Sequence, residues 1–300
     1  DNVKDMVIDV PPGLIGNPQA MPKCKPSQFP DCPLSTQVGT VTLGTLIIPE
    51  ITAPVFNMEP AQGKTAQFAF LALLFQIQVT AEIRSDGNYA LRMIIPETPT
   101  TAPLFSSRLT FWGVPNAPEN DRLRGAVCSF FLGCTTQDGR PYPPEGIPAR
   151  SAVVPFTSAP PQCGVTMTAR MRANSWQRPD QWVSAETTIP PLTGCDRLTF
   201  GPTLTVEPTT KQAGAPTGLA VDIEVPQNDA PGGVGTPPLK RAAVTLPEGM
   251  VVSPSAATGL EGCTDAQFGV GALGRPSCPR GSEIGTATII SPLQAEPMTG

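Results

Sequence analysis

The sequence contains no histidine, and only 15% of its 300 residues are charged. Without histidine the chain cannot form a Ser-His-Asp or Cys-His catalytic arrangement, a histidine metal triad or an imidazole pH switch. Most templates of hydrolases and metalloenzymes are therefore excluded. We predict no catalytic residue, no metal and no cofactor, and we expect a protein that is not an enzyme.

Long apolar runs and basic clusters are also missing. The longest unbroken apolar run is Phe68 to Phe75, far shorter than the ~20 residues that span a bilayer. The net charge is −5, and Lys240 with Arg241 is the main concentration of positive charge. Nucleic-acid binding needs a concentrated basic face. We therefore expect no membrane span in this chain and no nucleic-acid partner.

Proline and glycine are abundant instead, with 38 and 28 residues, which excludes long helices over most of the chain. Segments that alternate between apolar and polar residues are typical of strands: 77–83, 89–95, 165–171 and 219–225. The first two are joined by turn residues and predict a β-hairpin. We expect an all-β protein made of tandem β-sandwich or jelly-roll-like domains with short helical turns.

Eight cysteines fall into four sequential pairs. Structural zinc sites favour closer Cys-x2-4-Cys spacings and commonly use histidine, so disulfides are the better interpretation and metal binding the weaker one. Pairing between sequence neighbours closes the shortest loops, and disulfides indicate an extracellular or cell-surface location. The predicted structural disulfides join Cys24 to Cys32, Cys128 to Cys134, Cys163 to Cys195, and Cys263 to Cys278.

One segment pattern occurs twice. Each copy contains an apolar strand ending in Pro-x-Gly, a residue followed by proline (Asn17 or Ser253), a Cys-x-x-x-Gln-Phe segment and a final Gly-Thr strand. We expect one helical turn after Asn17 and after Ser253, and a second turn that buries Phe29 or Phe268. The matched stretches are 6–14 with 242–250, 24–29 with 263–268, and 32–42 with 278–288.

Changes in composition predict the domain boundaries. A Pro-, Thr- and Gly-containing stretch at 207–217 and a Pro/Gly-rich stretch at 226–238 favour a first β-sandwich domain at 1–203 and a second β domain at 204–300. The first domain contains the first repeat copy (1–48), and the second contains the other copy (239–291). Only the second copy has a leading strand before it, so we expect the chain to belong to a longer protein.

Two kinds of side chain could recognise a ligand. Trp176 and Trp182 lie in a polar segment, where they could stack on a sugar or anchor a partner; alternatively they cap the sandwich beside the Cys163–Cys195 disulfide. Carboxylates near aromatic residues could support glycoside hydrolysis, although exposed carboxylates are usually only solvated. These carboxylates are Glu59, Glu82, Asp121, Asp180 and Glu186. Trp112 is expected in the core, and calcium binding at 116–121 is a weaker alternative.

Several short sequence segments resemble segments of large secreted actinobacterial repeat proteins that have no assigned function. These segments are residues 10–18, 54–60, 111–115, 195–200 and 246–257. The resemblance covers most of the chain. It implies an exported protein of many modules, but it provides no activity and no catalytic residues.

These observations favour a non-enzymatic extracellular or cell-surface module with a structural or adhesive role. Its expected partners are copies of itself or other cell-surface components, and strand addition between modules could build a filament. The alternative hypothesis is a carbohydrate-binding module or a glycoside hydrolase, for which Trp176, Trp182 and the five carboxylates are the candidate residues.

Overall fold

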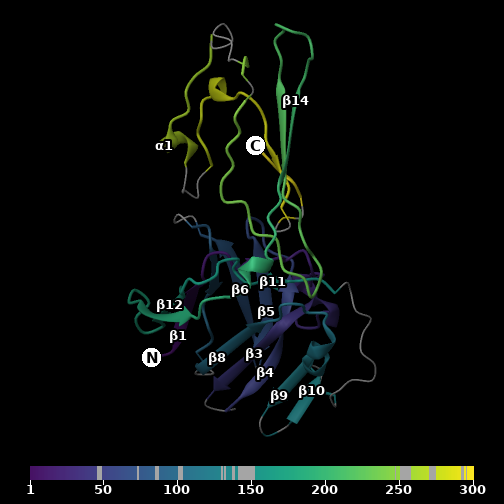
Figure 1. Ribbon diagram of the computed structural model, residues 1–300. Helices are drawn as coiled ribbons and strands as arrows, with labels where there is room; N and C mark the ends of the chain where they lie inside the picture. Colours follow the sequence, from purple (N-terminus) through teal and green to yellow (C-terminus); the bar gives the residue numbers. More distant parts are fainter. Residues whose placement is uncertain are drawn as a thin grey trace.

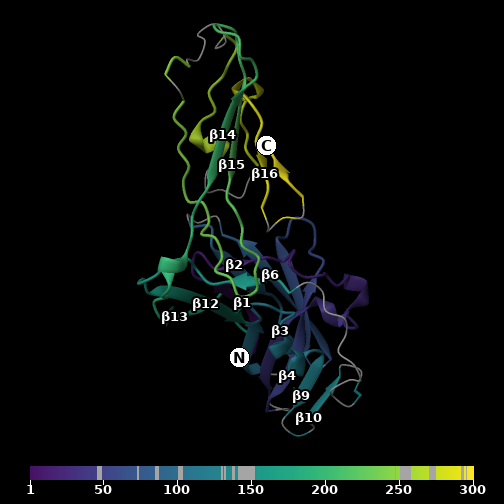
Figure 2. The same cartoon turned by 45° about the vertical axis from the view of Figure 1, so that its right-hand side comes forward.

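The structure is a computed structural model of residues 1–300. It describes the chain except for residues 46–48, 73, 85–87, 101–103, 130, 132, 137–138, 141–152, 247, 251–257, 270–274, 292–293 and 295. Short strands dominate, and the helical segments are single turns. Figures 1 and 2 show a broad curled sheet at one end of the molecule and a narrow extension at the other, where the β14–β15 hairpin and α1 lie.

The curled sheet contains eleven strands, and every pair in it is antiparallel. Its main path runs β8-β3-β4-β5-β6-β7-β1-β12-β13, while β9 and β10 extend from the start of β4. The strands are β1 Val3–Asp9, β3 Gln37–Thr45, β4 Ile51–Met58, β5 Ala66–Ala72, β6 Phe75–Ile83, β7 Leu91–Ile95, β8 Leu104–Phe111, β9 Ala126–Ser129, β10 Gly133–Thr136, β12 Met167–Ser175 and β13 Val183–Ile189.

The main core cluster lies on one face of this sheet, and a smaller cluster around Cys24, Cys32, Phe56 and Met58 lies on the other. Alternate residues of a strand point to the same face, so Val41 and Leu43 of β3, Phe68 and Phe70 of β5, and Val79 of β6 meet in one cluster. The rings of Phe68, Phe111 and Phe156 pack together in this cluster. β12 and β13 continue the sheet beyond the cluster, and β13 is exposed along nearly its whole length.

The other elements are small. Two strands, β2 (Ile15–Gly16) and β11 (Thr157–Ser158), pair beside the sheet. The part after residue 200 contains two separate two-stranded sheets, β14 (Thr203–Pro208) with β15 (Leu219–Glu224) and β16 (Thr288–Ile289) with β17 (Met298–Thr299). The single turns of helix are η1 Pro26–Gln28, η2 Leu34–Thr36, η3 Pro118–Leu123, η4 Cys195–Arg197, α1 Asp265–Phe268 and η6 Arg280–Ser282.

The predicted all-β class, the four nearest-neighbour disulfides and the hairpin between β6 and β7 are confirmed. The core is built by one strongly curled sheet, so the finer expectation of sandwich or jelly-roll domains stays a prediction. The boundary between 203 and 204 also stays a prediction. No helix in the described part of the chain is long and apolar enough to cross a membrane.

Two local expectations need correction. Residues 17–20 form a single hydrogen-bonded turn and not a turn of helix: Ala20 N donates to Asn17 O at 3.1 Å, and the Asn17 side chain accepts from Gln19 N at 3.0 Å. The equivalent Ser253 lies outside the described residues. Both aromatic residues were expected to be buried. Phe29 is half-buried against the cluster of Phe56 and Met58, whereas Phe268 is 58% exposed.

Candidate functional site

The repeated segment of the first copy is a small hydrogen-bonded unit closed by the Cys24–Cys32 disulfide. Its turn, η1, begins where Gln28 Oε1 accepts from Lys25 N at 3.2 Å. A second turn, η2, follows the disulfide, and there Thr36 Oγ1 donates to Pro33 O at 2.7 Å. β3 begins directly afterwards.

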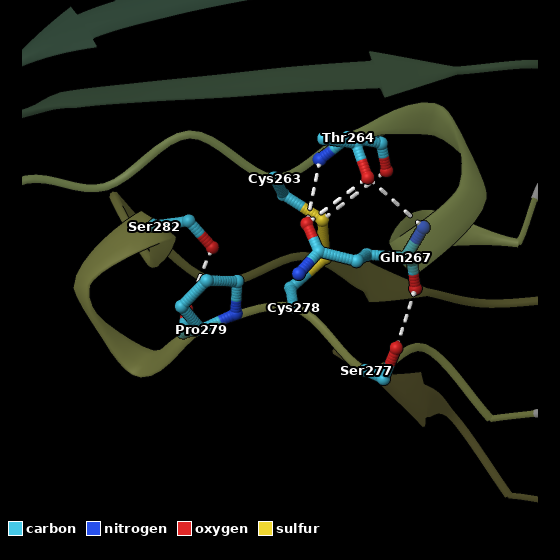
Figure 3. The surroundings of a disulfide bond; sticks show 7 residues. All are labelled: Cys263, Thr264, Gln267, Ser277, Cys278, Pro279 and Ser282. Atoms are coloured by element: carbon cyan, nitrogen blue, oxygen red, sulfur yellow. Dashed lines mark hydrogen bonds between the residues drawn. A yellow bond between two sulfur atoms is a disulfide. The ribbon is translucent and has the colours of Figure 1, made fainter.

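The second copy repeats these contacts (Figure 3). In α1, Gln267 Oε1 accepts from Thr264 N at 3.0 Å, while Thr264 Oγ1 accepts from Gln267 N at 3.3 Å, which is a capping box. Cys263 and Cys278 close the segment, and Ser282 Oγ donates to Pro279 O at 2.7 Å, as Thr36 does to Pro33 in the first copy. The local geometry therefore follows the shared sequence pattern.

Two pairs of glycines distinguish the copies. Gly13 and Gly249 both have a φ of +88°, which favours glycine, but only Gly13 packs against another segment, Pro160–Pro161. Gly39 lies so close to β8 that a Cβ there would be 2.0 Å from Thr110 O. Its equivalent, Gly285, has ordinary backbone geometry and no atom within 4 Å of a Cβ.

The first copy is fixed to the sheet by buried amides. The Asn57 side chain of β4 donates to the backbone oxygens of Pro18, Met21 and Pro22 at 3.0–3.2 Å. The backbone of Cys24 bonds that of Asn57 and Glu59. These bonds hold the disulfide loop over Phe56 and Met58.

Gln37, at the start of β3, makes the equivalent connection to η3 and the segment that follows it. Its amide donates to Leu123 O at 3.2 Å and accepts from Gly125 N at 2.8 Å. Asn57 and Gln37 are both fully buried, so each amide replaces water for several backbone groups. Neither residue was predicted from the sequence, although a polar residue inside an apolar strand is the signal that marks them.

The second copy forms only the beginning of the corresponding sheet. Thr288 pairs with Thr299 and Ile289 with Met298, a hairpin at the position where Thr42 pairs with Thr52 and Leu43 with Ile51 between β3 and β4, but with a connection that is one residue longer. The other edge of β3 pairs with β8, whereas the other edge of β16 pairs with no described strand. Ile284 is 89% exposed and Ile290 84% exposed.

A buried charge cluster, also missed from the sequence, joins β1 to β7. Asp9 accepts from Arg92 Nε at 2.5 Å and from Nη2 at 3.0 Å, and Arg84 Nη1 lies 3.7 Å from Asp9 Oδ2. The hydrogen bond from Arg92 lowers the pKa of Asp9, with weaker charge effects from Arg92, Arg84 and Arg172, although burial opposes them. Met6, Ile8 and Val10 alternate with Val7 and Asp9, which puts Asp9 on the face opposite Met6 and Ile8, but nothing in the sequence indicated its partners.

Two further groups have shifted pKa values near the first copy. Burial tends to raise the pKa of Asp5, but hydrogen bonds from the Glu97 backbone, Asn174 and Lys4 outweigh it and lower the pKa. Burial lowers the pKa of Lys23, and the nearby Glu59 carboxylate partly opposes that shift. Neither group belongs to a cluster of three Cys, Asp or Glu side chains in the described part of the chain.

The two candidate tryptophans have structural partners. Trp176 Nε1 donates to Thr98 O at 2.8 Å, and Lys4 Nζ lies 5.4 Å from its ring centroid. The Arg172 guanidinium lies 5.9 Å from the Trp182 ring. A cation thus lies against each ring. Trp112 is buried, as expected, with Arg124 over its ring.

The candidate carboxylates are spread over separate elements. Glu82 of β6 pairs with Lys64, Asp121 of η3 with Arg124, and Glu186 of β13 with Arg170. Glu59 and Asp180 are exposed. The described residues contain no group of three Cys, Asp or Glu side chains that could hold a metal ion.

A cleft of about 390 Å³ lies beside the Cys163–Cys195 disulfide. It is lined by β2, β11, η4 and the segment 227–236, and Arg197 and Asp229 are its charged residues. Backbone groups, prolines and small side chains form the rest of its wall. The cleft could admit a small polar ligand, but it brings no paired carboxylates together.

Comparison with protein-family models, with curated proteins and with solved structures finds no match for this chain.

Proposed function

We propose that this chain is a non-enzymatic structural module of an extracellular or cell-surface repeat protein. The observation that carries the proposal is the second repeat copy, which keeps the disulfide, the capping bonds and the hairpin position of the first copy while its outer strand edge pairs with no described strand. A unit of this kind is built to pack on a neighbouring sheet, as units of repeat proteins do.

The cysteines support the extracellular location. Four disulfides join all eight cysteines, and no free thiol remains. Such bonds persist in oxidising compartments and are rare in the cytosol. The resemblance to large secreted actinobacterial repeat proteins also supports an extracellular location. An exported module with exposed strand edges is suited to assembly with other copies of the module or to adhesion.

Fractionation of the native source would test this function. Antibody against the chain is expected to detect it at the cell surface or in the culture medium, with every cysteine resistant to alkylation until it is reduced. A reduced, cytosolic protein would overturn the proposal. Electron microscopy of the surface fraction would then show whether the protein is organised in fibres or in an adhesive layer.

A further inference from the structure

Three exposed apolar side chains lie at one end of the curled sheet, and we call them the apolar end: Leu74, Phe105 and Phe131. Leu74 lies in the turn between β5 and β6, Phe131 lies in the turn between β9 and β10, and Phe105 is the second residue of β8. Their exposed fractions are 89%, 69% and 70%. Turns usually carry glycine, proline or small polar residues, so large apolar side chains at these positions call for a physical reason.

The strand register brings the three residues to the same end of the sheet. β4 begins at Ile51, which pairs with Leu43 near the end of β3 and with Ser129 at the end of β9. β8 begins beside Thr45, the last residue of β3. β5 is antiparallel to β4, so its turn into β6 lies at the level where β4 begins. Figure 1 shows the β9–β10 hairpin at the end of the molecule away from the β14–β15 extension.

The hairpin connections at this end are apolar, whereas those at the other end of the same strands are polar. In the sequence, residues 46–50, 73–74 and 130–132 read Leu-Ile-Ile-Pro-Glu, Leu-Leu and Phe-Phe-Leu, with one charge among them. Several of these residues lie outside the described ones, so only their sequence is compared. The connections 59–65 and 84–90 contain four charged residues. The usual composition of turns is therefore kept at one end of the sheet and reversed at the other.

The apolar interior of the sheet also reaches this end. Thr45, Phe75 and Leu104 line a cavity of about 50 Å³ together with core residues such as Phe70. Because alternate residues of a strand face opposite sides, Phe105 faces away from the interior that Leu104 lines. Apolar side chains thus continue from the core to the outer surface, and a group of this kind marks a contact with an apolar partner.

We propose that the apolar end inserts shallowly into a lipid bilayer. Leu74 and Phe131 lie on separate turns, and a fluid acyl layer can receive each of them independently, whereas a protein partner would need a surface shaped to both. Insertion at the boundary between headgroups and acyl chains buries these side chains while the turn backbones stay near water. This contact goes beyond the proposed structural role, because it adds a lipid surface as a partner.

The charge of the chain indicates which lipids would be bound. The net charge is −5, and Glu50 is the charged residue of the β3–β4 connection. Anionic headgroups would repel this charge, whereas zwitterionic headgroups would not. Binding is therefore expected to depend on buried apolar area and to change little with salt concentration.

Cosedimentation of the full chain with vesicles of pure phosphatidylcholine tests the proposal. The wild type is expected to bind, and Leu74→Ser and Phe131→Ser should each lower the partition coefficient about tenfold, because each removes a large apolar side chain from the lipid. Phe200→Ser is the matched control, because Phe200 is 49% exposed and lies between η4 and β14, outside the apolar end. It should bind as the wild type does.

Two tryptophan variants keep the proposal testable if a serine variant does not fold. Relative to the wild type, the added emission of Leu74→Trp should shift to shorter wavelength on vesicles and should be quenched by lipids brominated on their acyl chains. The added emission of Phe200→Trp should do neither.

A wild type that does not cosediment, serine variants that bind as the wild type does, or binding that requires anionic lipid would overturn the proposal. If the chain associated with itself without vesicles, and Leu74→Ser and Phe131→Ser abolished that association, a second copy would be the occupant and the lipid proposal would be wrong. None of these outcomes alters the fractionation test, so the proposed structural function stands or fails separately.

Discussion

Arg92 and Asp9 face each other on neighbouring strands, and the guanidinium donates to both oxygens of the carboxylate. The Asp9 side chain is only 10% exposed, so this paired contact holds a buried charge. β1 belongs to the first repeat copy, and Arg92 belongs to the β6–β7 hairpin. The pair thus connects the repeat to the centre of the curled sheet.

Replacing Asp9 by asparagine is expected to reduce the free energy of unfolding by about 3 kcal/mol at pH 7, because the half-buried Arg92 and the largely buried Arg84 lose the Asp9 carboxylate. Because the folded pKa of Asp9 lies below its ordinary value of 3.8, its stabilising contribution is complete above that value and disappears as the pH falls through the folded pKa. Urea unfolding measured between pH 7 and pH 2 should show the wild type and Asp9→Asn converging at the acidic end.

Glu186→Gln provides the control for this prediction. Glu186 also pairs with an arginine, Arg170, but its side chain is 50% exposed, so the loss should be below about 1 kcal/mol. A similar loss in both variants would mean that burial does not determine the strength of these pairs.

Gly39 and Gly285 should differ sharply in their tolerance of a side chain. Gly39→Ala forces β3 and β8 apart, because a Cβ would meet Thr110 O at 2.0 Å, and about 3 kcal/mol of stability should be lost. Gly285→Ala should change the stability of the monomer by less than about 0.5 kcal/mol. Both values can be measured by denaturant unfolding at low protein concentration. An equal loss at both positions would show that Gly285 is already packed against a strand.

The Cys24–Cys32 and Cys263–Cys278 disulfides should contribute differently to the stability of the curled sheet. Replacing Cys24 and Cys32 by alanine removes the entropic restraint of a short loop, about 2.5 kcal/mol, and also disturbs the packing of Phe56 and Met58. Replacing Cys263 and Cys278 should leave this unfolding transition unchanged, because the second copy is not part of the sheet.

Tryptophan fluorescence can separate these two outcomes. All three tryptophans, Trp112, Trp176 and Trp182, precede the end of β13 at Ile189, so their emission reports unfolding of the curled sheet alone. If the two double variants lowered the midpoint equally, the second copy would be stabilising the sheet directly.

The features predicted correctly from the sequence are those set by neighbours along the chain. Disulfide pairing between nearby cysteines, the turn before Gln28 or Gln267 and the β6–β7 hairpin each depend on a few adjacent residues. The expectation that Phe268 is buried was wrong for the opposite reason. Phe29 packs against a cluster that contains Phe56 and Met58 of β4, whereas Phe268 is 58% exposed among the described residues. A local pattern cannot reveal which distant residues will cover a side chain.

The candidate site shows the same limit. Asp9 and Arg92 are 83 positions apart, and their contact depends on the order of strands in the sheet. Alternation fixed which face Asp9 occupies, but several arginines could have reached it. The Trp176 and Trp182 hypothesis had a comparable weakness, because the sequence could not show that Lys4 and Thr98 lie against the Trp176 ring.

A matched pair of tryptophan variants would separate structure from recognition. Trp176→Phe keeps a ring beside Lys4 but loses the hydrogen bond to Thr98 O, so about 1 kcal/mol of stability should be lost. Trp182→Phe keeps the ring's contact with Arg172, so its unfolding curve should match the wild type. Neither Trp176→Ala nor Trp182→Ala should change binding to a glycan array, because both rings serve the fold. Loss of a glycan signal in Trp182→Ala, with unfolding unchanged, would instead make that ring a carbohydrate contact and favour the alternative function.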